Sequence, residues 1–375
     1  MTQRTILFAG GGSGGHLFPA LTVARRMLER GDCDHVLFLT STRDIDARIM
    51  SDAVQETPAI QWRPDVAFPA GSRLRRILAV PGAMLKARRT VLRILEEHRP
   101  SLCVGIGAFA SVAASMMCAR RKVPLALMEQ NVVAGRATRF LSRYANVILA
   151  GLPLADHASQ GIHCPVVTTG VPVRAAISAV ASTRRHEVSR RPSLLIVGGS
   201  QGARNMNELV SQVLVAPEVL PDGWTVTHQT GDRDAERYQK LYAPHPHIQA
   251  RPFVRMEDAL AHADLVISRS GAGILAEIAC AAVPSVLIPH PESAGQHQLK
   301  NAQYFRDARA SLLMEQHAPN AAQHLTQILH DLTRDQDRCR SLAQGASRLA
   351  CPNAADLAAD ELAKLMAFNK KGTAP

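Results

Sequence analysis

The sequence is poor in aromatic residues and has none of the cysteine spacings that hold metal ions. Phe, Trp and Tyr make up 4% of the 375 residues, so the hydrophobic cores must consist mainly of Leu, Val, Ile and Ala. The cysteines are scattered, without a Cys-x-x-Cys pair, at positions 33, 103, 118, 164, 280, 339 and 351. Most lie in apolar runs, which predicts small core residues in a reducing compartment and no metal ligation.

Long apolar runs are absent as well. No run reaches the roughly 20 residues that a membrane-spanning helix requires. No signal peptide precedes the first predicted strand, Thr5–Ala9, so we expect a cytoplasmic protein. Basic residues are not interleaved with aromatic ones, which argues against a nucleic-acid-binding protein. The net charge of +11 still favours an anionic partner, such as a phosphorylated substrate or an acidic membrane face.

One stretch, residues 264–301, predicts a complete βαβ unit. Apolar residues 265–267 predict a buried strand, which ends at the glycine turn of residues 270–273. A short helical pattern carrying Glu277 follows, and then a second apolar strand and a polar loop with Gln298. Ligands of open α/β sheets bind at the carboxyl ends of the strands. We therefore expect a ligand pocket at this edge of the sheet.

The chain opens with a similar unit. A strand, a glycine loop at residues 10–15 and a helix follow one another, with Pro19 expected in the first helical turn and Gly31 after the last. The loop lacks the Lys-Ser/Thr of a phosphate loop, and no acidic residue ends the next strand as a nicotinamide site would require. His16 at the loop's end is either a helix-capping or packing residue or a general base at a cleft.

The architecture is repeated in the second half. Ser193–Val197 predicts a strand, residues 198–203 a glycine loop and Arg204–Val215 a helix. The length of the whole chain, 375 residues, and its 46% content of hydrophobic residues suit two domains. We expect the polar stretch Ser182–Arg191 to join them. Two such domains facing each other would create a deep cleft for a ligand.

Residues 72–99 mix basic and apolar side chains around a Pro81-Gly82 break. Residues 86–99 predict either a solvated helix face with a buried stripe or a continuation of the basic surface. For residues 73–85 the combination favours docking onto an anionic bilayer surface.

Polar residues also end a middle strand, Pro124–Met128, where Glu129, Gln130 and Asn131 follow. They are placed to contact a ligand, although Asn131 could instead cap the next helix.

Taken together, the segments resemble the MurG family, whose members transfer N-acetylglucosamine from UDP-N-acetylglucosamine to undecaprenyl-pyrophosphoryl-muramoyl-pentapeptide. The matching segments occur in the family's order and run through nearly the whole chain. They are GGGSGGHLFPALTVA (10–24), GIGAFAS (105–111), EQN (129–131), PVR (172–174), GGSQGARNMN (198–207), RSGAGILAE (269–277) and GQHQLKNA (295–302).

The resemblance implies an α/β protein of the GT-B fold, with two Rossmann-like domains whose parallel sheets face each other across a deep cleft. Residues 1–174 would bind the acceptor and the membrane, and the C-terminal helix 353–375 would pack back on this domain. Residues 175–352 would bind the UDP-sugar. The family's location at the cytoplasmic face of the inner membrane, as a peripheral protein, is implied as well.

The resemblance also implies roles for individual residues. Val254 would contact uracil through its main chain, Glu277 would bind the ribose hydroxyls, and Gln298 would bind the sugar. The first domain would complete the donor site, and the segment near Arg75 would associate with the membrane. The implied donor-binding residues are Ser13, Gly14, Gly15, Asn131, Arg174, Ser200, Val254, Ala272, Gly273, Ile274, Leu275, Ala276, Glu277 and Gln298. The implied membrane residues are Arg73, Arg75, Arg76, Ile77 and Leu78.

The implied reaction is an inverting transfer with no cofactor and no bound metal. The acceptor's 4-hydroxyl needs a base, for which His16 is the first candidate and Glu129 the second. Backbone amides and helix N-termini would stabilise the departing UDP. The chain departs from the family pattern at Met128, where histidine is usual, and at Val171, where asparagine is usual. Ser13 replaces a threonine but keeps the hydroxyl, and Gly107-Ala108-Phe109 replaces Gly-Gly-Tyr.

Three other functions fit parts of the sequence. A non-hydrolysing UDP-sugar epimerase shares the two-domain plan, but it would not need the basic-apolar segment. A UDP-sugar transferase acting on another lipid or glycan is a further alternative. A non-catalytic sugar-nucleotide-binding module is disfavoured because His16, Glu277 and both glycine loops are present.

Overall fold

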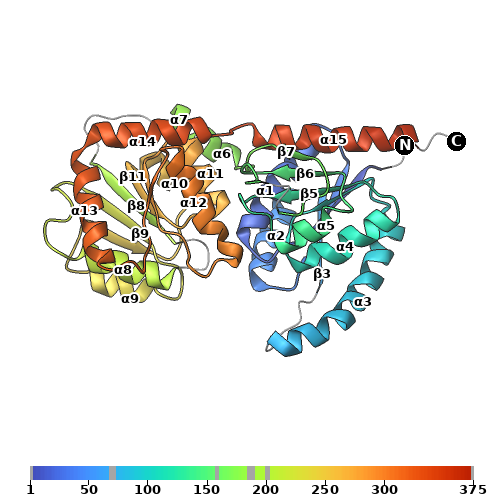
Figure 1. Cartoon of the computed structure of the whole chain (residues 1–375), viewed down its shortest axis with the longest axis horizontal. Coiled ribbons are helices and arrows are strands. Elements are labelled where there is room, and N and C mark those ends of the chain that lie inside the picture. The colour runs from blue at the N-terminus through green and yellow to red at the C-terminus, as the bar shows by residue number, and fades with distance from the viewer. Residues whose placement is uncertain (1–2, 67–72, 157–159, 184–190, 199–202, 373–375) are drawn as a thin grey trace. The chain divides into compact units, whose positions relative to one another are not determined.

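The computed structural model of the protein describes residues 3–66, 73–156, 160–183, 191–198 and 203–372. The chain divides into two compact units, each an α/β layer structure (Figure 1). The first unit contains Met1–Pro172 together with Asn353–Pro375, and the second contains Val173–Pro352. The division thus falls two residues before the boundary expected from the sequence.

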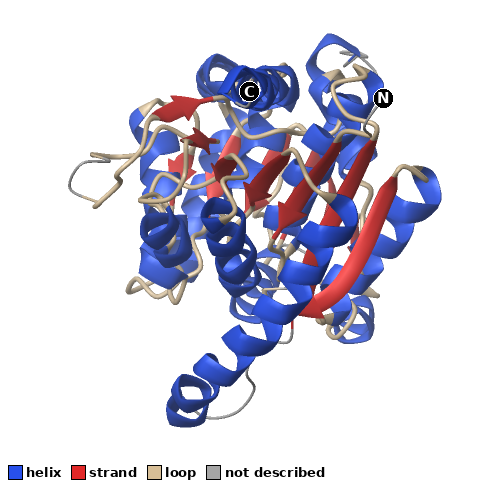
Figure 2. Ribbon diagram, turned by 90° about the vertical axis from the view of Figure 1, so that its right-hand side faces the viewer, coloured by secondary structure: helices blue, strands red, loops and turns tan. Residues whose placement is uncertain are grey.

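The first unit is built on a seven-stranded sheet with the order β3-β2-β1-β4-β5-β6-β7, in which every pairing is parallel. Helices cover both faces of this sheet (Figure 2). The strands are β1 (Thr5–Ala9), β2 (His35–Ser41), β3 (Ile60–Val66), β4 (Leu102–Gly105), β5 (Leu125–Glu129), β6 (Val147–Ala150) and β7 (Val166–Thr168). The helices are α1 (Gly14–Glu29), α2 (Asp44–Glu56), α3 (Arg73–His98), α4 (Ala108–Arg120), α5 (Arg136–Leu141) and α15 (Ala354–Gly372).

Strand β1 shows why the apolar run at the N-terminus becomes a central strand. Ile6 and Phe8 face one hydrophobic core, where Phe8 stacks on Phe38 at 5.1 Å between ring centroids. Leu7 and Ala9 face the core on the other side of the sheet. Parallel strands are buried on both faces and therefore read as continuous apolar runs. The predicted strand Thr5–Ala9 is confirmed.

Two helices differ from their predicted limits. Helix α1 begins at Gly14, directly from the glycine loop, so Pro19 lies inside the helix and not in its first turn. Pro19 cannot donate to the carbonyl of Gly15, and because Gly15 is exposed, water can satisfy that group. Helix α3 continues through Pro81 and Gly82, where a break was expected. A proline removes one hydrogen bond of a helix without necessarily ending it.

The C-terminal part of α3 carries the buried stripe that was one of the two predictions for residues 86–99. Ala87, Val91, Ile94 and Leu95 are buried and belong to the core on one face of the sheet. Arg88 and Arg89 lie between them and are exposed. The apolar spacing therefore predicted this helix face correctly.

The second unit has a six-stranded parallel sheet with the order β10-β9-β8-β11-β12-β13. Its strands are β8 (Ser193–Val197), β9 (Thr225–Gln229), β10 (Ile248–Arg251), β11 (Leu265–Ser268), β12 (Ser285–Leu287) and β13 (Leu312–Leu313). Its helices are α6 (Ala175–Ser178), α7 (Val180–Thr183), α8 (Arg204–Leu214), α9 (Ala235–Tyr242), α10 (Met256–His262), α11 (Ala272–Ala281), η1 (Ala294–Gln296), α12 (His297–Asp307), α13 (Ala321–Arg334) and α14 (Gln336–Leu349).

Two short helices, α6 and α7, lie between the two sheets in the sequence. Ile177 of α6 and Val180 of α7 are buried in one core of the second unit, together with Leu195 of β8 and Ile278 of α11. Residues 184–190, most of the expected linker, lie outside the described residues.

The last helix, α15, belongs to the first unit. Its Ala358, Ala359, Leu362 and Met366 are part of the same core as β1 and α1. Ion pairs join the two helices, from Arg26 to Asp356 at 2.6 Å and from Arg30 to Asp360 at 2.7 Å.

Two composition-based expectations can be compared with the structure. Cys33, Cys103, Cys118 and Cys280 are buried, and none of the seven cysteines forms a disulfide, which agrees with the core assignment. Within the described ranges, none of the helices combines the length and the apolarity that crossing a membrane would require.

Candidate functional site

The strand order of each sheet reverses at a central pair of strands, and some of the predicted site residues, among them Ser13, His16 and Ala272, follow the strands of these pairs. In the first unit the switch point lies between β1 and β4, and in the second between β8 and β11. Loops that leave a sheet in opposite directions at such a point create a crevice, the usual ligand site of this architecture.

At the first switch point, Ser13 and His16 form a pair. Ser13 is extended (φ −162°) and precedes the first residue of α1, and its Oγ lies 3.0 Å from Nδ1 of His16. When Nδ1 carries the proton and donates it to Ser13, Nε2 is the basic nitrogen of the ring. Gly107, with φ +94°, follows β4, and a Cβ there would stand 3.2 Å from that Nε2. A glycine at this position therefore keeps space beside the imidazole.

The glycine loop is held by Asp46, a residue that the sequence analysis did not identify. The fully buried carboxylate of Asp46 accepts the backbone N–H of Gly12 at 2.7 and 2.9 Å and the hydroxyl of Ser41 at 2.5 Å. A Cβ on Gly11, whose φ is +147°, would lie 2.7 Å from Asp46 Oδ2. The loop thus needs glycine at position 11 because a carboxylate occupies the space of a side chain.

Glu129 organises the loop after β5. Its Oε1 accepts from the backbone and side-chain nitrogens of Asn131 at 3.2 and 3.1 Å. Its Oε2 accepts from the backbone of Gly135 and the hydroxyl of Thr138, both at 2.8 Å. Both carboxylate oxygens of this buried residue are used within the loop, so it stabilises the conformation that presents Asn131.

The two main departures from the family pattern lie inside the first unit. Met128 and Val171 are buried, and Val171 lies so close to Gly151 that a Cβ there would meet its Cγ2 at 2.6 Å. The apolar side chains therefore fill space in the core.

At the second switch point, α11 begins directly after β11. Gly271 precedes the first helical residue, and Ala272, Gly273 and Ile274 form the first turn. Apart from the adjacent residues and the backbone of α11 itself, no described atom lies within 4 Å of a Cβ placed on Gly271 or Gly273. Packing within the unit does not demand glycine at either position, whereas a ligand lying against the helix N-terminus would. Leu275 and Ala276 continue this helix, and Ser200 lies outside the described residues.

Glu277 of α11 is the most perturbed carboxyl group of the candidate site. Only 20% of its side chain is exposed, and its Oε1 lies 3.9 Å from a terminal nitrogen of Arg174. Burial raises its pKa to about 7, an effect that Arg174 opposes and Glu257 increases. A carboxyl group that titrates near neutral pH beside an arginine is typical of a functional site.

Glu257 of α10 is the second carboxylate around Arg174, and the sequence analysis did not identify it. Its Oε2 lies 3.3 Å from the other terminal nitrogen of Arg174, and its Oε1 lies 3.2 Å from Arg255. Burial acts to raise the pKa of Glu257, but a hydrogen bond from its own backbone, Arg174 and Arg255 together lower it. Two neighbouring carboxyl groups thus have pKa values shifted in opposite directions.

Gln298 is oriented by the loop after β12. Its side-chain carbonyl accepts the backbone N–H of His290 at 2.9 Å, which leaves the amide nitrogen as a donor. Its backbone carbonyl accepts the hydroxyl of Ser270 at 2.8 Å, and buried Asn301 donates to the carbonyl of Ser270 at 3.1 Å. Helix α12 is therefore tied to the turn that starts α11.

Arg269 adds a buried positive charge at the same sheet edge. One terminal nitrogen donates to the carbonyls of Ile288 and Pro289, both at 3.0 Å. Burial lowers its pKa to about 10. Val254, the position expected to contact uracil, is buried after β10, and its neighbour Phe253 is 68% exposed.

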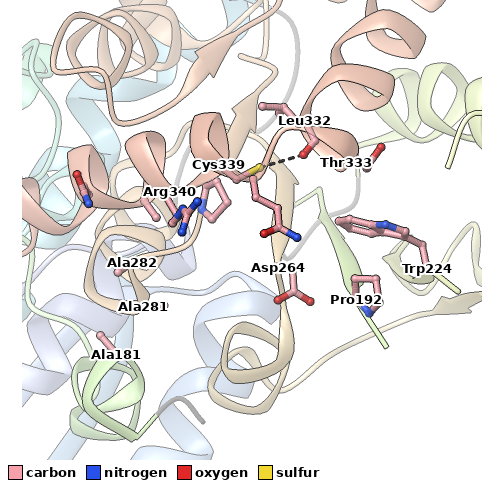
Figure 3. A pocket seen from close by; sticks show the side chains of 14 residues that line it. Ala181, Pro192, Trp224, Asp264, Ala281, Ala282, Leu332, Thr333, Cys339 and Arg340 are labelled. Carbon is pink, nitrogen blue, oxygen red and sulfur yellow. Dashed lines mark hydrogen bonds between the residues drawn. The ribbon is translucent and has the colours of Figure 1, made fainter. Parts of the chain in front are cut away.

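A cavity of about 650 Å³ lies at the opposite edge of the second sheet, lined by residues that precede the strands and by residues of α13 and α14 (Figure 3). Trp224 and Asp264 lie on its wall with Cys339 and Arg340, and Cys339 Sγ donates to the carbonyl of Leu332 at 3.1 Å. None of the predicted site residues lines this cavity.

Comparison with known proteins gives one consistent result. The N-terminal domain of glycosyltransferase family 28 matches residues 6–150, and the C-terminal domain of that family matches residues 193–359. A curated relative from Anaeromyxobacter sp. (strain Fw109-5) is 34% identical over 366 residues, covering 96% of this chain and 93% of its own length. It is named UDP-N-acetylglucosamine--N-acetylmuramyl-(pentapeptide) pyrophosphoryl-undecaprenol N-acetylglucosamine transferase.

Solved structures agree with this match. The crystal structure of MurG from Acinetobacter baumannii aligns with a TM-score of 0.77 at 29% identity, covering 96% of this chain and 99% of that one. A UDP-GlcNAc 2-epimerase from Neisseria meningitidis aligns with a TM-score of 0.68 at 13% identity, covering 96% and 100%, which is a likeness of fold alone. The predicted fold class, two Rossmann-like parallel-sheet domains, is confirmed.

Proposed function

The chain belongs to the MurG family of glycosyltransferases, and from this membership we propose that it transfers N-acetylglucosamine from UDP-N-acetylglucosamine to the 4-hydroxyl of an undecaprenyl-pyrophosphoryl-muramoyl-pentapeptide. The product is the disaccharide lipid used in peptidoglycan synthesis. The observation that carries the proposal within the structure is the second switch point, where the N-terminus of α11 follows β11 and the same helix carries Glu277 beside Arg174.

The second unit supplies the donor site. Ribose hydroxyls donate to the carboxyl group of Glu277, and the N–H groups at the start of α11, with Arg174 close by, favour the negative diphosphate. The space beside Gly271 and Gly273 allows the nucleotide to approach the backbone. Gln298 donates to the sugar through its amide nitrogen.

The first unit supplies the acceptor side. The 4-hydroxyl of the acceptor attacks the anomeric carbon from the face opposite the diphosphate, so the bond to oxygen forms as the bond to UDP breaks and the configuration is inverted. His16 accepts the hydroxyl proton at Nε2, with Ser13 orienting the ring through Nδ1. The four hydrogen bonds on the Glu129 carboxylate favour a structural role for it, and therefore favour His16 as the base.

The basic part of α3 places the enzyme at its lipid substrate. Arg73, Arg75, Arg76, Ile77 and Leu78 fall within α3, but their side chains lie outside the described residues, so the sequence alone supports this role. Basic and apolar residues on one helix favour binding to an anionic membrane surface. The enzyme is thus peripheral, at the cytoplasmic face of the membrane that holds its acceptor.

The test uses purified full-length protein with radiolabelled UDP-N-acetylglucosamine and a short-chain analogue of the muramoyl-pentapeptide lipid. We expect label in the lipid and release of UDP that requires the acceptor. Interconversion of the donor sugar without acceptor would instead identify an epimerase. Binding without turnover would identify a sugar-nucleotide-binding module.

A further inference from the structure

Arg174 lies between two carboxyl groups of the second unit, and the two contacts are unequal. One terminal nitrogen is 3.3 Å from Glu257 Oε2, and the other is 3.9 Å from Glu277 Oε1. Glu257 and Glu277 are 18% and 20% exposed, whereas the side chain of Arg174 is 42% exposed. Both carboxyl groups are thus largely shielded from water, and the arginine is the most exposed member of the cluster.

The pKa of Glu277 depends on the charged residues of the helices that pack against α11. Arg174 precedes α6, and Glu257 lies in the first turn of α10 and pairs with Arg255. On α11 itself, Cys280 lies one turn further along, and burial raises the pKa of its thiol to about 11, so it is uncharged. Helix α7 carries no charged residue within Val180–Thr183.

Helix α14 also packs against α11, and two of its arginines pair with aspartates. Arg340 pairs with Asp337, and Arg338 lies 3.7 Å from Asp331. Arg348 lies in the last turn of α14. The charges that act on Glu277 are those of Arg174 and Glu257.

We propose that Glu257 is a positioning residue of the donor site, which holds the guanidinium of Arg174 away from a close pair with Glu277. This inference rests on the proposed function, because it assigns Glu277 to the ribose of the donor. Without Glu257, Arg174 would move closer to Glu277, the other carboxyl group that it contacts, and occupy the oxygens that the ribose hydroxyls need.

The arrangement couples binding of the donor to release of a proton from Glu277. With Arg174 closer to Glu257 than to Glu277, burial raises the pKa of Glu277 to about 7. An ionised carboxylate accepts both ribose hydroxyls, whereas the neutral acid offers one fewer acceptor. The diphosphate of a nucleotide sugar is a diester without a proton that titrates in this range. We therefore expect donor binding to release a proton from Glu277 and to weaken as the pH falls below about 7.

The experiment is a calorimetric titration of the full-length protein with UDP-N-acetylglucosamine at several pH values between about 5.5 and 8.5, in two buffers of different ionisation enthalpy. Glu257→Gln removes the charge and keeps the shape. It should lower the pH midpoint of donor binding by about 1 unit, because a like charge is lost and an opposite charge moves closer to Glu277. Glu257→Asp, which keeps the charge, should retain the wild-type midpoint.

Asp258→Asn is the matched control. Asp258 lies next to Glu257 in the first turn of α10, is 67% exposed and pairs with Arg255, not with Arg174. It should leave the midpoint unchanged. If Glu257→Gln weakens binding equally at every pH with the midpoint of wild type, Glu257 is only structural and the inference is overturned.

A second readout does not depend on the donor. The ¹³C signal of the Glu277 carboxyl group, assigned by its loss in Glu277→Gln, is titrated in the ligand-free protein. We expect its midpoint to fall in Glu257→Gln and to stay in Asp258→Asn; an unchanged midpoint in Glu257→Gln overturns the inference. Failure of the wild-type protein to bind UDP-N-acetylglucosamine would contradict the proposed function, and this titration would still decide the role of Glu257.

Discussion

The carboxylate of Asp46 accepts the backbone N–H of Gly12 with both oxygens, at 2.7 and 2.9 Å. This contact joins the start of α2 to the glycine loop that precedes α1. It explains how a loop of glycines, which is flexible in an unfolded chain, acquires one conformation beside His16.

Replacing Asp46 should therefore loosen the loop. Asp46→Asn would place an amide nitrogen against donors, and an unsatisfied buried donor costs about 1–3 kcal/mol. We expect a loss of stability of that size in urea unfolding and a lower kcat/KM. Asp52→Asn, an exposed position on the same helix, is the control and should match wild type. Wild-type activity and stability in Asp46→Asn would show that the loop is held by other contacts.

His16→Ala should mainly lower kcat. Loss of a general base typically costs about 10²–10⁴-fold in rate, and the donor site of the second unit should keep its KM for UDP-N-acetylglucosamine. Steady-state kinetics at saturating acceptor separate the two parameters. A variant that retains kcat within a few-fold of wild type would remove His16 as the base.

Gly107→Ala offers an independent test of the role of His16. It brings a methyl group to within 3.2 Å of His16 Nε2 and strains a residue with φ +94°. We expect reduced turnover with donor affinity retained. Gly82→Ala, where a Cβ meets nothing within 4 Å, is the matched glycine control.

The pKa of Glu277 predicts how stability depends on pH. Its folded-state pKa of about 7 lies above the ordinary value of 4.5, so its contribution to the free energy of unfolding is fully present below 4.5 and is lost as the pH rises through 7. Glu277→Gln removes this loss. The difference in the free energy of unfolding between the variant and wild type should therefore change in favour of the variant by on the order of 3 kcal/mol as the pH is raised from 5 to 8.

The two tryptophans make that measurement specific, because Trp62 lies in the first unit and Trp224 in the second. Urea unfolding followed by Trp224 fluorescence in a Trp62→Phe background reports the second unit. Glu236→Gln, at an exposed position, should show no such gain. An equal response of the two variants would contradict the raised pKa of Glu277.

His228 should have the opposite dependence. Nε2 of His228 donates to Asn207 Oδ1 at 3.2 Å, and in the neutral imidazole Nδ1 accepts from the hydroxyl of Tyr242 at 2.9 Å. Burial lowers its pKa from 6.5 to about 3, so its contribution to stability is present above pH 6.5 and is lost as the pH falls. His228→Gln should flatten the acid side of the stability profile of the second unit, whereas His330→Gln, half exposed, should not. An unchanged acid slope would mean that His228 is protonated in the folded protein.

Membrane binding is tested by charge reversal in α3. Changing Arg75, Arg76 and Ile77 to Glu, Glu and Ser should release the protein from vesicles of phosphatidylglycerol and phosphatidylethanolamine. At about 1 kcal/mol per basic residue, the loss of two predicts a roughly 30-fold weaker partition before reversal is considered. The double variant Arg88→Glu with Arg89→Glu, on the exposed face of the same helix, tests whether reversing the charge of another basic pair weakens vesicle binding equally. Equal sedimentation of the first variant and wild type would place the docking surface elsewhere.

Local sequence patterns predicted the strands at both switch points and the glycine turns after β1 and β11, while the predicted loop after β8 lies mostly outside the described residues. An apolar run followed by glycines specifies a buried strand and its exit, and the two neighbours are adjacent in the chain. Asp46 could not be predicted in this way, because it lies 34 residues from the loop that it holds. Its position in the sequence, in the first turn of a helix, is that of an ordinary exposed acidic residue.

Glu257 could not be predicted for the same reason, because it is distant in sequence from Arg174, which it contacts. Arg174 and Glu277 were expected from family motifs, but a third charged residue from another helix is brought to them only by packing of α6, α10 and α11. Whether a carboxyl group is buried depends on its neighbours in space, and the pKa of Glu277 follows from that burial. The start of α1 was misjudged because proline suggested a first turn, whereas the glycine loop itself begins the helix.

The position of α15 has a consequence for biosynthesis. The first unit completes one of its hydrophobic cores with Ala358, Leu362 and Met366, residues that the ribosome adds only after the whole second unit. Until they emerge, the apolar face of α1 that they cover is open to water and to other chains. The second unit, which is continuous in sequence, has all its strands before that point. The unit that is synthesised first is therefore the one that finishes folding last.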